Sequence, residues 1–107
     1  MLLARTTLSD KLMSLSSLTK YPTEKVWNGE RSRKLPLEVQ KIGRRKLRML
    51  NNSIDINDLR IPPANRLEKL SGNFADYYSI RINDQWRIIF KWSQDHALDI
   101  QIIDYHK

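Results

Sequence analysis

In the second half of the chain, apolar side chains recur at every second position, which is the spacing of a β-strand with one buried face. In the first such run, Tyr78, Ile80 and Ile82 fall on one side. Two further runs follow polar turns at residues 83–85 and 93–95. Their apolar members are Trp86, Ile88, Phe90, Trp92, Leu98, Ile100 and Ile102. The pattern predicts an antiparallel meander of three strands with one apolar face.

In the first half of the chain the apolar spacing is helical. A short helix is predicted to begin at Pro22 and to end at Asn28 and Gly29, since proline suits a first turn and glycine readily takes the left-handed conformation that ends helices. A longer helix is predicted from Pro36 to about Leu50. Its apolar face carries Val39, Ile42, Gly43, Leu47 and Leu50.

Lys46 lies on the apolar side of this longer helix and breaks its pattern. Either its stem snorkels along the apolar surface or that side of the helix is only partly covered. Earlier in the chain, residues 13–18 form a weak candidate for a short strand. Together these elements predict an α+β fold, in which two N-terminal helices cover the apolar face of a small, curved and mainly antiparallel sheet.

Composition narrows the chemistry that this fold can perform. The chain has 107 residues, 40% of them hydrophobic and 29% charged, which suits one globular domain. It has no cysteine and only two histidines, so disulfides, thiolate sites and histidine-rich metal sites are excluded, and no cofactor is expected. No apolar run is long enough to span a membrane, and the N-terminus lacks the apolar block of a signal peptide. The cytoplasm is therefore the predicted location.

The net charge of +7 favours a polyanionic partner, either nucleic acid or an acidic protein, although it can also serve solubility. Four cations form a one-signed stripe on the predicted longer helix. They are Lys41, Arg44, Arg45 and Arg48. Such a stripe repels itself, which suggests a partner, either ribosomal RNA or an acidic protein surface.

The first predicted hairpin places Arg81 opposite Arg87 on the less apolar face. Like charges across a strand pair are destabilising unless both are well solvated or share an anion. Phosphate is the obvious anion, because a guanidinium can bond two of its oxygens. Lys91 lies along the same face and adds to its positive field. A solvated polar face without a ligand is the alternative.

Asp104, Tyr105 and His106 follow the last predicted strand. A histidine there can exchange protons near neutral pH, and a tyrosine can stack on a base or donate to it. The plainer alternative is a frayed polar terminus. The three tryptophans are interpreted as core and not as base-stacking platforms, because Trp86 and Trp92 fall on the apolar strand face.

Four stretches of the chain resemble the HigB-type plasmid-maintenance killer toxins of the RelE superfamily. They are residues 23–29, residues 59–68, residues 78–88 and the ending Asp104, Tyr105 and His106. The resemblance runs from about Leu15 to His106. It implies a RelE-like fold and a metal-free endoribonuclease that cuts mRNA in the ribosomal A site. It also implies a HigA-type helix-turn-helix antitoxin as partner, with operator DNA contacted only through the toxin–antitoxin complex.

The resemblance also implies roles for individual residues. The acid-Tyr-His cluster of the family falls on Asp104, Tyr105 and His106, and its transition-state arginine falls on Arg87. The other cations are expected to contact phosphates of the RNA. They are Arg44, Arg45, Arg48, Arg66, Lys69, Arg81 and Lys91. The residue types suit the reaction, since arginines stabilise charge on the phosphorane and a histidine transfers protons.

The chain departs from the family pattern at several places. Ser71 stands where a lysine is common, Asn73 where aspartate is common, and Glu68 where some members have histidine. A missing lysine removes one phosphate contact, for which Lys69 is the candidate replacement. Residues 1–12 are interpreted as an N-terminal extension or a misassigned start, and residues 13–107 as the toxin domain.

Two other functions are compatible with parts of this pattern. A toxin fold that has lost efficient cleavage would act mainly as an antitoxin-binding and operon-regulating module, and the serine at position 71 motivates that reading. A generic nucleic-acid-binding domain rests on charge alone. It is disfavoured because the strand aromatics Trp86, Phe90 and Trp92 lie on the predicted core face.

Overall fold

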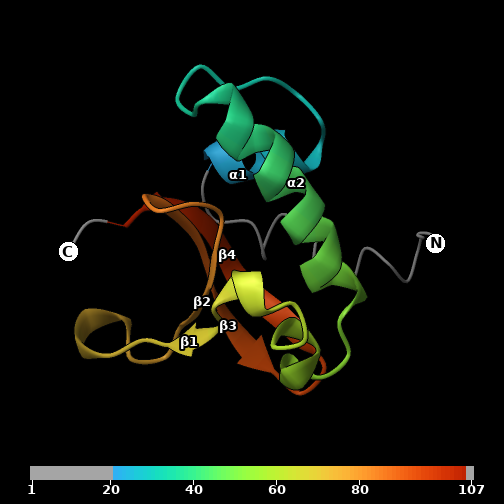
Figure 1. The fold of residues 1–107 in the computed structure, drawn as a ribbon, viewed down its shortest axis with the longest axis vertical. Helices are drawn as coiled ribbons and strands as arrows, with labels where there is room; N and C mark the ends of the chain where they lie inside the picture. The colour runs from blue at the N-terminus through green and yellow to red at the C-terminus, as the bar shows by residue number, and fades with distance from the viewer. Residues whose placement is uncertain (1–20, 106–107) are drawn as a thin grey trace.

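The computed structural model describes residues 21–105 (Figure 1). The predicted extension at residues 1–12, the candidate strand at residues 13–18 and the predicted proton-transfer residue His106 lie outside the described residues. Helix α1 spans Tyr21–Trp27 and helix α2 spans Leu37–Asn52. Four strands follow them along the chain. They are β1 (Glu68–Lys69), β2 (Tyr78–Arg81), β3 (Trp86–Ser93) and β4 (His96–Asp104).

The four strands form one sheet in the order β1-β2-β3-β4, and every neighbouring pair is antiparallel. The α+β class and the meander of the last three strands are confirmed. The turn between β2 and β3 is the predicted one, and the side chain of Asn83 holds it by accepting the N–H groups of Gln85 and Trp86 at 2.9 and 2.8 Å. Strand β1 was not predicted, because two residues carry no periodicity that a sequence pattern can register.

The helices lie over one face of the sheet, and the core fills the space between them (Figure 1). The middle rung of that face is Ile80, Ile88 and Ile102, which are aligned by the strand register. Val39 and Leu47 of α2 are buried in the same cluster. The tryptophans Trp27, Trp86 and Trp92 pack against it, which confirms that they belong to the core. Across residues 21–105, helices are too short or too polar to cross a bilayer.

A buried threonine ties α1 to the sheet. The hydroxyl of Thr23 accepts the backbone N–H of Ile102 in β4 at 3.0 Å, and Thr23 is fully buried. A buried strand N–H must have a partner, because an unpaired one has lost its water without compensation. The contact therefore fixes the helix against β4, the strand that leads directly to Tyr105.

Replacing Thr23 by valine is expected to destabilise the protein by about 1–3 kcal/mol, because valine keeps the shape but leaves the Ile102 N–H unsatisfied. Urea unfolding measures the change. Thr23→Ser is the matched control, since it keeps the hydroxyl and should lose less. Equal losses for the two variants would show that the methyl group matters and the hydrogen bond does not.

Candidate functional site

The sheet face away from the helices carries a polar pocket of about 370 Å³ at the β2–β3 hairpin. Its lining residues come from β2, from β3, from the turn between these strands, from the segment around β1 and from the residue after β4. They are Arg66, Glu68, Arg81, Asn83, Asp84, Arg87 and Tyr105. Three cations and one phenol thus converge from segments that are up to 39 positions apart in the sequence (66 to 105). Such a pocket suits an anion with an attached ring or sugar.

Arg87 is the most firmly held of the three cations. Its Nη1 donates to the hydroxyl of Ser79 at 2.8 Å and lies 3.6 Å from Oε1 of Glu68. Its guanidinium carbon lies 4.9 Å from the ring centroid of Tyr105, and only 12% of the side chain is exposed. A guanidinium restrained on three sides loses little further entropy when it binds an oxyanion.

Arg81 lies directly opposite Arg87, as predicted. The neighbouring Ile82 donates its N–H to the carbonyl of Trp86, so Ile82 and Trp86 form a hydrogen-bonded pair. Hydrogen-bonded and non-hydrogen-bonded pairs alternate along an antiparallel ladder, which makes Arg81 and Arg87 a non-hydrogen-bonded pair. Side chains lie closer together in such a pair than in a hydrogen-bonded one. Each arginine has an acidic neighbour, Asp84 for Arg81 and Glu68 for Arg87. The carboxylates offset the repulsion, and a phosphate in the pocket would compete with them.

Lys46 reaches this region from the other side of the sheet. Its Nζ donates to the backbone carbonyl of Arg81 at 2.5 Å, and only 5% of the residue is exposed. Strand β1 pairs only with Ser79 and Tyr78, so the outer edge of β2 has no strand partner at Arg81. Burial lowers the pKa of Lys46, and the charges of Arg45 and Arg81 lower it further. Lys46, which breaks the apolar pattern of α2, therefore supplies the hydrogen bond that no neighbouring strand gives to β2 at Arg81.

The end of β4 is attached to the turn of the hairpin. The Tyr105 N–H donates to the carbonyl of Gln85 at 2.6 Å, and the Gln85 side chain donates to Oδ2 of Asp104 at 3.0 Å. Asp104 pairs with Trp86 in the register, so it belongs to the opposite face from Arg87 and does not line the pocket. Of the predicted catalytic residues, the structure brings together Arg87 and Tyr105.

The other predicted phosphate contacts are distributed around the molecule. Arg66 lines the pocket with a left-handed backbone, φ 46°, a conformation that costs about 1–3 kcal/mol and is common at functional sites. Lys69 pairs with Tyr78, and its ammonium lies 4.9 Å from the centroid of that ring. Lys69 therefore lies on the opposite face of the sheet from Glu68 and outside the pocket. From there it does not replace the lysine that is common in the family where this chain has Ser71.

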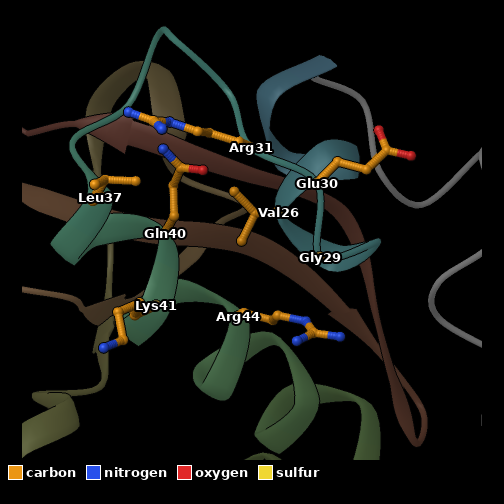
Figure 2. A pocket seen from close by; sticks show the side chains of 8 residues that line it. All are labelled: Val26, Gly29, Glu30, Arg31, Leu37, Gln40, Lys41 and Arg44. Atoms are coloured by element: carbon orange, nitrogen blue, oxygen red, sulfur yellow. The ribbon is translucent and has the colours of Figure 1, made fainter.

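The helical stripe forms a separate surface. Arg45 and Arg48 are exposed and, with Arg44, line a shallow hollow along α2. Arg44 also borders a cavity of about 310 Å³ between α1 and α2, where its guanidinium extends past Gly29 while Lys41 points away (Figure 2). The Arg44 Nε is buried there without a hydrogen-bond partner. The stripe therefore offers cations to a partner without contributing to the pocket.

Sequence reasoning missed Ser79 and treated Glu68 only as a departure from the family pattern. The position of Ser79 between Tyr77 and Arg81 was visible, but its burial and its bond to Arg87 depend on the fold. Among residues 21–105, His, Cys, Asp and Glu side chains do not gather in groups of three that could hold a metal ion.

Comparison with known proteins identifies the family. The model of the RelE-like toxin of type II toxin-antitoxin system HigB matches residues 19–106. The chain belongs to the HigB toxin family. "Toxin HigB-1" of Vibrio cholerae serotype O1 is 38% identical over 95 residues, which cover 89% of this chain and 99% of that protein. An uncharacterized protein of Haemophilus influenzae is 40% identical over 74 residues, which cover 69% of this chain and 73% of that protein.

The stretch that matches the HigB family contains the whole pocket at the β2–β3 hairpin. The match includes the β2–β3 hairpin, the lining residues near β1 and Tyr105. As a toxin of a type II toxin–antitoxin system, the protein has an antitoxin partner.

Raising the pH toward 10.5 is expected to stabilise this HigB-family toxin through Lys46. Its pKa in the folded state is below 10.5, so between the two pKa values the unfolded chain binds more protons and the free energy of unfolding rises with pH. Lys46→Met should lose this increment. Urea unfolding of both proteins from neutral pH to about 10 measures the difference.

Lys34→Met, at an exposed position, is the control and should parallel the wild type. A difference between wild type and Lys46→Met that stays flat or falls with pH would contradict the assignment.

Proposed function

We propose that this HigB-family toxin is an endoribonuclease that cuts mRNA in the ribosomal A site and thereby inhibits translation. The observation that carries the proposal is the Arg81–Arg87 pair, which shares one pocket with Tyr105. Two guanidiniums on one face match the double negative charge that a phosphodiester develops in the phosphorane, and an aromatic ring beside them matches a base. The α+β architecture supports a RelE-like arrangement of two helices on a curved sheet. Residues 13–107 are proposed as the toxin domain and residues 1–12 as an extension.

The reaction proposed is attack by the 2′-hydroxyl of the RNA on its own phosphate, without a metal ion. The 2′-oxygen bonds to phosphorus, the bond to the 5′-oxygen breaks, a base takes the 2′ proton and an acid supplies one to the leaving 5′-oxygen. Arg87 is the proposed group that stabilises the extra charge on the phosphorane, and its restraint by Ser79 and Tyr105 supports this role. Arg81 and Arg66 supply further positive charge.

The remaining roles follow the family pattern. His106 is the proposed proton-transfer residue, Tyr105 orients or stacks on a base, and Asp104 orients the end of β4 through Gln85. Lys91, on the same sheet face as Arg87, is proposed as an additional phosphate contact, and Lys69 as a contact on the opposite face, outside the pocket. The stripe Arg44, Arg45 and Arg48 is proposed to contact ribosomal RNA.

The partners proposed are the ribosome with its mRNA and a HigA-type helix-turn-helix antitoxin. Operator DNA would be contacted only through the toxin–antitoxin complex, and the working location is the cytoplasm. The basic composition and the two separate cationic surfaces support a polyanionic target.

A second function is favoured by one specific observation. Ser71 stands where the family resemblance implies a phosphate-binding lysine, and Lys69 lies on the other face of the sheet from the pocket. Loss of one such cation can cost orders of magnitude in rate while leaving the fold intact. The alternative is therefore a cleavage-impaired toxin that acts mainly through binding its antitoxin and regulating their operon.

Induced expression of the wild type is expected to arrest growth, and Arg87→Ala or His106→Ala should relieve the arrest at equal protein level. Removing one preorganised cation from a phosphoryl site costs about 10²–10³ in rate. Arg33→Ala, at an exposed loop position, is the matched control and should remain toxic. If both site variants arrest growth as the wild type does, the site assignment is wrong.

Primer extension on a translated message is expected to show cuts within the A-site codon when wild-type toxin is present and none when no toxin is expressed. Ser71→Lys should increase the cut fraction by about tenfold if the missing lysine limits the rate. Absence of cuts, together with tight antitoxin binding, would exclude the nuclease and support the binding module.

A further inference from the structure

A second cluster lies on the same sheet face, one strand length away from the arginine pair. Continuing the register of Tyr78 with Phe90 by one residue places Tyr77 opposite Lys91. The Lys91 Nζ lies 5.3 Å from the centroid of the Tyr77 ring and 3.5 Å from Oδ2 of Asp99. The face thus carries cations and an aromatic ring at both of its ends.

An exposed phenylalanine completes this cluster. Phe74 ends the 3₁₀ turn Gly72–Phe74 and is 43% exposed, although its ring meets Tyr77 edge-on with centroids 5.7 Å apart. The loop around it is held by backbone hydrogen bonds. Tyr77 N–H donates to the carbonyl of Phe74, and Leu70 N–H donates to that of Tyr77, both at 2.9 Å. The turn that carries Phe74 lies beside β1 (Figure 1), and its hydrogen bonds hold the partly exposed ring in a fixed place.

We infer that Phe74, Tyr77 and Lys91 form a base-stacking subsite for single-stranded RNA. The inference rests on the proposed nuclease function and extends it. Tyr77 and Arg81 are four residues apart on an extended strand, which is about 13 Å. The subsite therefore takes the base of a nucleotide displaced along the message from the scissile phosphate, and not one of the two nucleotides that this phosphate joins.

RNA fits this cluster better than an apolar protein segment for two reasons on the same face. Lys91 presents an ammonium next to the Tyr77 ring, and its surface pair with Asp99 is of the weak, exposed kind that a phosphate can displace. The arginine pair lies on the same two strands, so one continuous strand of RNA can reach both ends. Aromatic rings beside cations are the usual platform for unpaired bases, since every base has a stacking face.

The test uses Phe74→Leu, which keeps an apolar side chain and removes the ring, and Tyr77→Leu as a second variant. Ile61→Ala is the matched control, because Ile61 is also an exposed hydrophobic residue but lies outside the cluster. Cleavage is measured on ribosomes that hold a defined message in the A site. The expected result is a KM raised roughly tenfold with kcat little changed for both variants, and wild-type values for the control.

A second measurement detects stacking of a base on the toxin when the message cannot be cleaved. Messages carry 2-aminopurine at one position at a time and a 2′-deoxy sugar at the scissile nucleotide, which removes the attacking hydroxyl. Wild-type toxin on the ribosome should quench the fluorescence at one displaced position, and Phe74→Leu should not. Quenching on this uncut message supports the subsite even if the wild type proves unable to cleave, so the subsite and the nuclease function can fail separately.

Two outcomes would overturn the inference. Unchanged KM and unchanged quenching in Phe74→Leu, with thermal unfolding like that of the wild type, would show that the ring does not contact RNA. Weaker antitoxin binding in Phe74→Leu with unchanged RNA behaviour would assign the ring to a protein interface.

Discussion

The amide of Ile82 donates to the carbonyl of Trp86 where β2 turns into β3, and this bond sets the register of the hairpin. In that register Ile80 faces Ile88 and Arg81 faces Arg87. A shift by one residue would move every side chain of one strand to the other face. The same few hydrogen bonds therefore build the apolar face under the helices and the charged face that holds the pocket.

The charged face is possible because its repulsion is balanced locally. Asp84 and Glu68 each lie next to one arginine, and Tyr105 covers the Arg87 guanidinium. Lys46 donates a hydrogen bond to the Arg81 carbonyl from the core side. This part of the β2 edge therefore does not need β1, which pairs only with Tyr78 and Ser79 and does not extend to Arg81. The core and the pocket are thus connected through one buried amine and one backbone carbonyl.

The positively charged groups of this HigB-family toxin fall into separate surfaces with different surroundings. In the pocket, Arg87 is restrained by a hydrogen bond to Ser79 and by the Tyr105 ring, as expected for a group that stabilises charge at a defined position. Arg45 and Arg48 on α2 are exposed, as expected for groups that bind a large polyanion through its field. The pocket and the exposed stripe on α2 are therefore distinct cationic surfaces with different restraints on their side chains.

The amino-acid sequence by itself determined the three-strand meander, the facing of Arg81 and Arg87 and the core position of the tryptophans, because the two-residue period and polar turns are local properties. It also pointed to Lys46 as an anomaly without locating its acceptor. Only the tertiary structure decided that this acceptor is the Arg81 carbonyl, that Ser79 holds Arg87, and that Asp104 and Lys69 lie outside the pocket. These facts depend on which strand edges are paired and where each strand ends, and such long-range contacts are invisible to a local pattern.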